Sequence, residues 1–355
     1  MSRFFSEKYA LLTPYVPGEQ PKQAKYVKLN TNESPFTPPQ SVVDAVEEEG
    51  KRLHLYSDPE SALLTEKTAE MLGVKKSQVL MTNGSDEALN FAFMAFCDEK
   101  HPIVFADITY GFYPVFAQLN NIPYEIIPLK NDFSIDCDDY VGLGKNIVIA
   151  NPNAPTGKAL TVGEIEKIVK SNPDNVVIID EAYVDFGGES VVPLVDTYDN
   201  LLVTQTFSKS RSLAGGRLGF AVGNEKLIAD LNTLKYSTNP YNVNRMTAAA
   251  GYAALCETEW FENNRNTIIQ NREYTAAELK KLGFTVLDSK TNFLFAKSDT
   301  VDGKELYEQL KARGVLVRRF NAERIKDYIR VTIGTKEQMD VFLQKTQEII
   351  REKQQ

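Results

Sequence analysis

The chain has 355 residues, of which 43% are hydrophobic, and this suits a globular protein large enough for two domains. Its net charge of −8 argues against nucleic acid or an anionic membrane as a partner, because both require a basic face. The chain has only two histidines, too few for a His-rich metal site and an unpromising start for a Ser-His-Asp triad, so we expect no metal.

The cysteines and the N-terminal region indicate a location. Cys97, Cys137 and Cys256 are odd in number and far apart in the chain, which favours free thiols in a reducing compartment. Residues 1–15 lack the apolar stretch of a signal peptide, and no apolar run approaches the roughly 20 residues that span a bilayer. We therefore expect a cytoplasmic protein.

Between Lys51 and about Ala221, helical segments alternate with short apolar runs. The runs lack period-2 alternation, which is typical of strands buried on both faces of a parallel sheet. We predict helices over 86–97 and 162–171, and strands over 102–106, 125–128, 146–150, 176–179, 201–204 and 218–222. This region is therefore predicted to be an α/β layer structure.

Past Thr258 the pattern changes. We predict a long helix over 260–281, a helix over 303–313 and a terminal helix from Lys336 with one apolar stripe. Strands are predicted over 284–287, 292–296, 315–317 and 329–332. The first 30–40 residues are expected to join this part or to wrap over a neighbouring molecule. The predicted organisation is a large α/β domain over 41–255 and a smaller α+β domain formed by 1–40 and 256–355.

Lys209 follows the predicted strand 201–204 in a loop, with Arg211 and Arg217 nearby in sequence. In α/β sheets, ligands bind beyond the carboxyl ends of the strands. Cationic neighbours and shielding from water lower the proton affinity of a lysine amine, so that it can attack a carbonyl group. On this segment alone, an exposed loop lysine is the commoner alternative.

Asp180 directly follows the apolar run 176–179, so it is expected at the carboxyl end of a strand, facing a cleft. It could cap a helix or bind magnesium. A carboxylate in this place is also what keeps a pyridine nitrogen protonated, which makes the ring an electron sink.

Three weaker motifs also fall at predicted strand ends. Gly84, with Ser85 and Asp86, precedes a helix whose free N–H groups suit a phosphate, although the same residues make an ordinary N-cap. The turn Asn151–Gly157 could present a side-chain amide or serve only as a tight connection. Tyr110 could stack on an aromatic ring or pack in the core.

In combination these motifs are far more specific than any of them alone. Their order resembles that of the fold-type-I pyridoxal-phosphate aminotransferases over nearly the whole chain, and it is most similar to that of the histidinol-phosphate aminotransferases. The phrases that carry this resemblance are residues 13–15 (TPY), 28–33 (KLNTNE), 83–87 (NGSDE), 240–244 (PYNVN) and 330–334 (RVTIG).

The resemblance implies a fold-type-I architecture and pyridoxal 5′-phosphate as the cofactor. Lys209 would hold the cofactor as a Schiff base and then move the proton at the substrate Cα. Asp180 would pair with the pyridine nitrogen, Tyr183 would contact the phenolic oxygen, and Tyr110 would stack on the ring. The remaining implied cofactor contacts are Gly84, Ser85, Asp86, Thr206, Ser208 and Arg217.

One position departs from the family pattern, in which an asparagine stands directly before Pro-Thr-Gly and contacts the phenolic oxygen. Here that residue is Ala154. We expect either that Asn153 reaches the oxygen instead or that Tyr183 acts alone. Tyr56 resembles the tyrosine that reaches the phosphate of a neighbouring subunit, which implies a homodimer with shared sites.

The resemblance further implies transamination between L-histidinol phosphate and 2-oxoglutarate, giving imidazole acetol phosphate and glutamate. Arg330 resembles the family's carboxylate-binding arginine, and its planar fork suits a phosphate equally well. The other implied substrate residues are Tyr15, Asn32 and Arg318, the last of which could also be a solvated strand end. The alternatives are an aromatic-amino-acid aminotransferase, a decarboxylase of a phosphorylated amino acid, or a ligand-binding α/β protein without catalysis.

Overall fold

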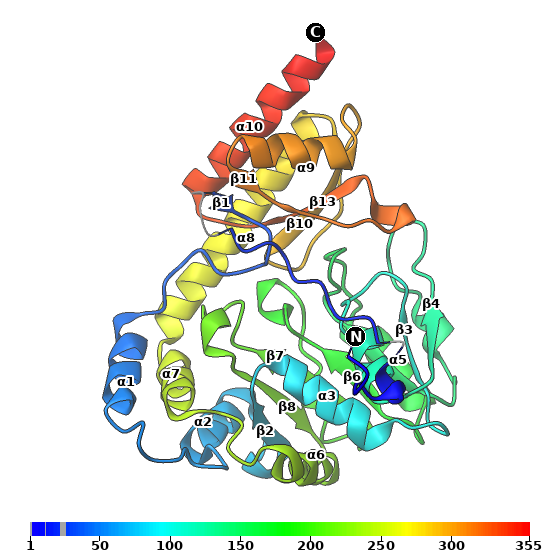
Figure 1. Ribbon diagram of the computed structural model, residues 1–355, viewed down its shortest axis with the longest axis vertical. Coiled ribbons are helices and arrows are strands. Elements are labelled where there is room, and N and C mark those ends of the chain that lie inside the picture. The colour runs from blue at the N-terminus through cyan, green and yellow to red at the C-terminus, as the bar shows by residue number, and fades with distance from the viewer. Residues whose placement is uncertain (1, 11, 22–25) are drawn as a thin grey trace.

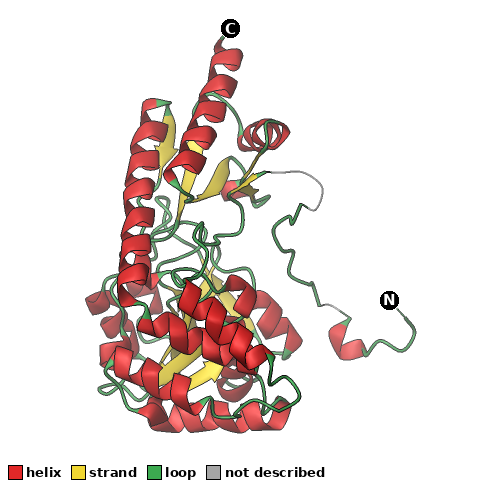
Figure 2. Ribbon diagram, turned by 90° about the vertical axis from the view of Figure 1, so that its left-hand side faces the viewer, coloured by secondary structure: helices red, strands yellow, loops and turns green. Residues whose placement is uncertain are grey.

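The computed structural model describes residues 2–10, 12–21 and 26–355 of the chain. A large sheet between helices occupies the lower part of Figure 1, and a smaller sheet lies above it with helices beside it. Near the N-terminus, the 3-10 turn Glu7–Tyr9 stands away from the rest of the chain (Figure 2), whereas Thr13 donates from its backbone N–H to Gln118 (3.0 Å). Of the helices in the described part, none combines the length and the apolar character needed to cross a bilayer.

The large sheet has seven strands in the order β2-β8-β7-β6-β5-β3-β4. Neighbouring strands are parallel except where β8 is involved, because β8 is antiparallel to both β2 and β7. The strands are β2 (Val79–Thr82), β3 (Ile103–Ala106), β4 (Tyr124–Ile127), β5 (Asn146–Ala150), β6 (Val177–Asp180), β7 (Leu201–Thr206) and β8 (Gly219–Gly223).

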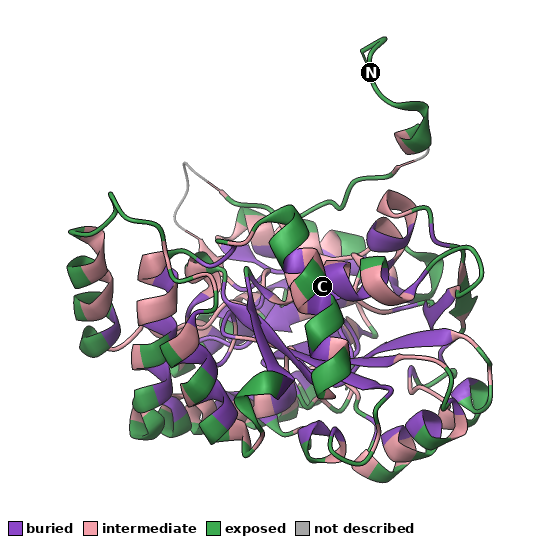
Figure 3. Cartoon of the chain, turned by 90° about the horizontal axis from the view of Figure 1, so that it is seen from below, coloured by how far each residue is buried: buried purple, intermediate pink, exposed green. Residues whose placement is uncertain are grey.

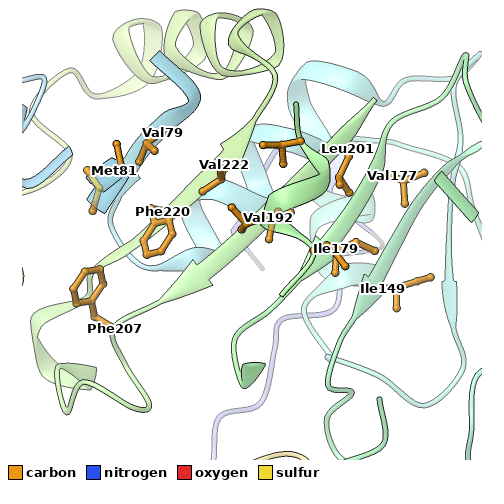
Figure 4. Close-up of a cluster of buried hydrophobic side chains, with 14 of the residues drawn as sticks. Val79, Met81, Ile149, Val177, Ile179, Val192, Leu201, Phe207, Phe220 and Val222 are labelled. Atoms are coloured by element: carbon orange, nitrogen blue, oxygen red, sulfur yellow. The ribbon is translucent and has the colours of Figure 1, made fainter. Parts of the chain in front are cut away.

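Helices cover both faces of this sheet, so successive residues of one strand enter two different cores. In β6, Val177 and Ile179 belong to one apolar cluster, part of which Figure 4 shows, and Ile178 belongs to the other. The first cluster includes side chains of α1 (Gln40–Gly50), α2 (Ala62–Leu72), α5 (Val162–Ser171) and α7 (Arg245–Cys256). The second includes those of α3 (Ser85–Phe96), α4 (Tyr113–Leu119) and α6 (Glu225–Thr238). Figure 3 shows the strands buried and the outer helix faces exposed.

The smaller sheet is antiparallel, with the order β12-β13-β10-β9. Its strands are β9 (Phe284–Val286), β10 (Phe293–Ser298), β12 (Arg318–Arg319) and β13 (Tyr328–Thr332). The same part of the chain contains the helices α9 (Gly303–Ala312) and α10 (Lys336–Gln354). A separate strand pair joins β1 (Val27–Lys28) in parallel to β11 (Val315–Leu316). Residues 27–28 thus pair with a strand of the second part of the chain, while the assignment of residues 1–40 to a smaller domain stays a prediction.

Helix α8 (Thr258–Lys281) links the two parts. Near its start, Phe261 borders a cavity together with large-sheet residues, and near its end Leu279 belongs to the core of the smaller part. Between them the buried Arg272 donates from Nη1 to the carbonyl of Phe186 (2.7 Å) and to that of Thr291 (2.8 Å). The helix is thus fixed to both parts through one guanidinium group.

The α/β prediction is confirmed, with two differences. Strand β2 was not predicted, and β8 runs against the parallel pattern expected for that region. The connection from β7 to β8 contains only a short 3-10 turn, Ala214–Gly216, and no helix that could carry the chain across the sheet for a parallel return. The boundaries 41–255 and 256–355 stay a prediction.

Candidate functional site

A cavity of about 190 Å³ opens at the carboxyl ends of the neighbouring strands β5, β6 and β7. The last residues of these strands, Ala150, Asp180 and Thr206, border it. This edge of a parallel sheet is where α/β proteins bind ligands. The predicted site residues that line the cavity are Ser85, Asp86, Tyr110, Asp180, Tyr183, Thr206, Ser208, Lys209 and Arg217.

The first turn of α3 and the loop after β7 form one end of the cavity. Gly84 precedes the helix with φ 76°, and a Cβ there would lie 2.6 Å from Arg217 Nη2, so glycine leaves the room that the guanidinium occupies. Arg217 donates to Ser208 Oγ (3.4 Å) and to Asp86 (3.0 Å). Free helical N–H groups, a hydroxyl and a guanidinium are the donors that suit a phosphate.

Close backbone contact holds this end in shape. A Cβ on Gly219, the first residue of β8, would lie 2.4 Å from the backbone nitrogen of Ser85. Thr206 Oγ1 accepts from the backbone N–H of Ser208 (3.1 Å) and donates to Ser208 Oγ (3.0 Å). The strand, the loop and the helix N-terminus are therefore fixed relative to one another.

Asp180 lies at the other end and is 4% exposed. Its carboxylate accepts from Tyr113 Oη (3.0 Å), Thr204 Oγ1 (3.3 Å) and the backbone N–H of Ala182 (3.3 Å). Loss of hydration outweighs these neutral hydrogen bonds and raises the pKa of Asp180 to about 6. A protonated ring nitrogen in the cavity would supply the cation that this buried carboxylate lacks among its hydrogen-bond partners.

Two tyrosines stand between these ends. Tyr110 donates to Asp86 (2.7 Å), and burial together with that carboxylate raises its pKa, so its hydroxyl stays protonated. Tyr183 follows β6, packs edge-on against Phe293 at 5.2 Å between ring centroids, and accepts at Oη from Asn32 Nδ2 (2.9 Å). The cavity therefore offers an aromatic surface and a hydroxyl whose own proton is free to donate.

Lys209 projects from the loop after β7 into the same space. Its Nζ lies 5.8 Å from the centroid of the Tyr183 ring and donates to the carbonyl of Thr31 at 3.5 Å. Glu33 lines the cavity as well. Burial raises its pKa, but hydrogen bonds from Lys28 and Thr31, with the charges of Lys28 and Lys209, together hold the pKa below the ordinary value. The amine thus faces a segment from the N-terminal region.

Asn153 does not line the cavity, although it was predicted to. Its Nδ2 donates to the carbonyl of Ile108 (2.9 Å) and to Thr156 Oγ1 (3.0 Å), and its Oδ1 accepts from Thr109 Oγ1 (2.8 Å). Ala154 borders the cavity instead. Hydrogen bonds to Thr156 in the turn and to Ile108 and Thr109 after β3 thus occupy the one amide that could have replaced the missing asparagine.

The predicted substrate residues lie around the cavity rather than in its wall. Arg330 is half-buried, and its buried Nε has no partner within the described part of the chain. Its guanidinium carbon lies 5.2 and 5.5 Å from the ring centroids of Phe293 and Phe320, and Nη2 donates to the carbonyl of Asn30 (3.2 Å). Burial lowers the pKa of this arginine. Arg318 donates to the carbonyls of residues 16 and 17 (3.0 and 3.2 Å), next to Tyr15, which stacks on Phe112 at 4.5 Å. Asn32 is buried against Tyr183.

Tyr56 is 80% exposed and stacks on Tyr241 at 4.6 Å, away from the residues that line the cavity.

Several cavity residues had no role predicted from the sequence. Thr31 and Glu33 come from the N-terminal segment. Tyr113, behind the cavity wall, supplies the hydroxyl bonded to Asp180 and was not predicted either. The phrase 28–33 was recognised as a motif, but nothing in its residue types placed it beside Lys209.

Known proteins are similar to this chain over nearly its whole length. The model of the class I and II aminotransferases matches residues 24–345. The histidinol-phosphate aminotransferase of Brachyspira hyodysenteriae is 49% identical over 99% of this chain and all of its own length. That of Clostridium acetobutylicum is 47% identical, with the same coverage.

Among solved structures, histidinol-phosphate aminotransferase from Sinorhizobium meliloti in complex with pyridoxal-5′-phosphate aligns with a TM-score of 0.84 at 21% identity. The alignment covers 92% of this chain and 91% of that one, and it supports the fold. The chain belongs to the class I and II aminotransferases, and within them to the histidinol-phosphate aminotransferase family, whose cofactor is pyridoxal 5′-phosphate.

Proposed function

We propose that the protein transfers the amino group of L-histidinol phosphate to 2-oxoglutarate, giving imidazole acetol phosphate and glutamate. The observation that carries this proposal is the similarity over 99% of the chain to relatives that bear the name of this activity. The geometry of the cavity adds support, because its two ends suit the phosphate and the ring nitrogen of pyridoxal phosphate.

Bound pyridoxal phosphate supplies an aldehyde that condenses with amines and a protonated ring that withdraws electrons from the substrate. In this proposal Arg217, Ser208 and the first turn of α3 would hold the phosphate, with Thr206 fixing Ser208. Asp180 would keep the ring nitrogen protonated, Tyr110 would offer an aromatic surface to the ring, and Tyr183 would donate to the phenolic oxygen.

Lys209 would hold the cofactor through its Nζ, because its side chain lines the cavity. As a free amine it would serve as the general base that takes the proton from the substrate Cα. The lysine lies beside the carbonyl of Thr31 (3.5 Å), which leaves its Nζ with a hydrogen-bond acceptor while it is protonated.

We assign Arg330 to binding the anionic group that each of the two substrates carries. Its buried Nε has no partner among the described residues, and two phenylalanine rings lie within 5.5 Å of the guanidinium, where they would shield an anion from water. Glutamate would present a carboxylate there and histidinol phosphate its phosphate, with Tyr15, Asn32 and Arg318 close by.

Paired steady-state rates test this function. With 2-oxoglutarate as the acceptor, histidinol phosphate is expected to give a higher kcat/KM than phenylalanine. A preference for phenylalanine would favour an aromatic-amino-acid aminotransferase. Release of CO₂ from a phosphorylated amino acid, with histidinol phosphate inert, would favour a decarboxylase.

We also propose a homodimer with shared active sites. Leu53 and Tyr56 lie in the segment between α1 and α2 and are 60% and 80% exposed, and Leu63, in the first turn of α2, is 74% exposed. Tyr56 stacks on Tyr241, which is itself partly exposed. Apolar side chains gathered on one surface are a common mark of a protein interface.

Mixed dimers test the shared site. Lys209→Ala and Tyr56→Ala are each expected to be poorly active alone. If the Tyr56 hydroxyl serves the partner's cofactor, unfolding and refolding the two variants together should restore up to about a quarter of the wild-type activity, because half of the dimers then contain one intact site. Activity no higher than the sum of the two variants would contradict sharing. Ultracentrifugation gives the oligomeric state independently.

We place the protein in the cytoplasm. This rests on its biosynthetic family and on its three cysteines, which carry free thiols.

A further inference from the structure

Asn32 is buried at the junction of the two parts of the chain, and its hydrogen bonds fix the orientation of its side-chain amide. The backbone N–H of Asn32 donates to Thr332 Oγ1 (2.9 Å), and that hydroxyl donates to Asn32 Oδ1 (3.1 Å). With Oδ1 accepting, Nδ2 is directed at Tyr183 Oη, 2.9 Å away. The carbonyl of Asn32 also accepts from Asn292 Nδ2 (3.0 Å). The residue is therefore held by several contacts with the smaller part.

This contact determines what the Tyr183 hydroxyl can do. An amide Nδ2 carries only donors, so Tyr183 Oη must accept from Asn32. The phenolic proton of Tyr183 is then free to be donated into the cavity that the tyrosine lines. Without Asn32, the hydroxyl would have no described partner that fixes its rotation.

The orientation of the Tyr183 hydroxyl is important because of the residue at position 154. The family has a side-chain amide there, whereas this chain has Ala154 at the cavity, and the amide of Asn153 is already hydrogen-bonded elsewhere. We infer that Asn32 is a positioning residue that sets the Tyr183 hydroxyl as donor to the cofactor's phenolic oxygen, compensating for the amide absent at position 154. The inference rests on the proposed function, in which Tyr183 contacts that oxygen.

The consequence is measurable in the spectrum of the holoenzyme. A hydrogen bond donated to the phenolic oxygen stabilises its charged form. It therefore lowers the pH at which the Lys209-bound cofactor takes up its proton, an event that changes the visible absorbance. A role for Asn32 in folding alone would leave that midpoint where it is.

Two substitutions remove the donor with little change in shape. Asn32 has φ 57°, a conformation that glycine and aspartate tolerate, so Asn32→Gly and Asn32→Asp keep the backbone. Each is expected to move the absorbance midpoint upward by about 0.5–1 pH unit. In Asn32→Asp a carboxylate would accept the Tyr183 proton and turn it away from the cofactor. Ala154→Asn, which restores a direct donor, is expected to move the midpoint downward.

A double-mutant cycle shows whether Asn32 acts through Tyr183. Tyr183→Phe should raise the midpoint by itself, and adding Asn32→Gly to it should cause no further shift. The inference is overturned if both Asn32 variants titrate like the wild type, or if Asn32→Gly shifts the midpoint equally with phenylalanine at position 183. If Asn32→Gly fails to fold, Asn32→Asp decides. A wild-type protein that binds no pyridoxal phosphate would instead remove the proposed function itself.

Discussion

Replacing Lys209 with alanine is expected to lower kcat for histidinol phosphate by at least about 10³-fold, because the substitution removes both the covalent attachment and the general base. The variant should fold normally, since Lys209 projects into a cavity and its one described hydrogen bond is a long contact of 3.5 Å. Steady-state rates and the visible spectrum, with and without added methylamine, measure the effect.

The matched control is Lys226→Ala, which removes an exposed lysine on α6 and should retain wild-type activity. Partial recovery of Lys209→Ala with methylamine would show that a free amine is what the site has lost. A Lys209→Ala protein that kept a tenth of the wild-type rate would be incompatible with the assigned role.

Replacing Asp180 with asparagine is expected to lower kcat by about 10²-fold or more, because an amide does not keep the ring nitrogen protonated. The same change should stabilise the cofactor-free protein. Burial raises the pKa of Asp180 from an ordinary 3.8 to about 6. A shift of that size corresponds to roughly 3 kcal/mol of unfavourable free energy for the charged form in the folded state. Because asparagine gives up one acceptor, a gain of about 1–3 kcal/mol is expected at pH 8.

The pH dependence of that gain has a definite sign. The folded carboxyl group binds its proton more tightly than the unfolded one, so the cost of its charge is fully present above pH 6 and is lost as the pH falls toward 3.8. Urea unfolding of the cofactor-free proteins should therefore give a difference between variant and wild type that is largest at pH 8 and shrinks toward pH 4.

Glu181→Gln provides the matched control. Glu181 is equally buried, and desolvation raises its pKa to about 7, but its partners are Ser190, Val191 and Gln205, and it does not line the cavity. Its substitution should change stability with pH in the same sense while kcat falls less than about tenfold. Equal losses of kcat in the two variants would remove the specific role of Asp180.

Local signals explain why parts of the fold could be predicted. Helix α5 (Val162–Ser171) was predicted to the residue; Thr161 and Glu164 form a capping box at its start. Strand β2 (Val79–Thr82) was missed, although its apolar run is as long as the runs 125–128 and 176–179, which were predicted. The order of strands in the sheet and the reversal of β8 depend on pairings between distant segments, which no local pattern encodes.

The same limit applies to the site. Asp180, Lys209 and Ser85 could be found because strand ends and helix starts meet at one edge of an α/β sheet. Glu33 and Thr31 could not, because the pairing of β1 with β11 carries them there across almost the whole chain. Whether Asn153 or Ala154 faces the cavity depends on the hydrogen bonds that the Asn153 side chain makes. The residue types alone do not determine these hydrogen bonds.

If helix α8 tilts as a rigid body, its anchor at Arg272 is the point about which it turns. The guanidinium holds the carbonyls of Phe186 and Thr291, one on each part of the chain. At a rise of about 1.5 Å per residue, the arm toward Thr258 is about 21 Å long and the arm toward Lys281 about 14 Å. A tilt about Arg272 would therefore displace the end beside the large sheet half as far again as the end within the smaller part. A spectroscopic probe attached near Thr258 would therefore report a closure of one part on the other most sensitively.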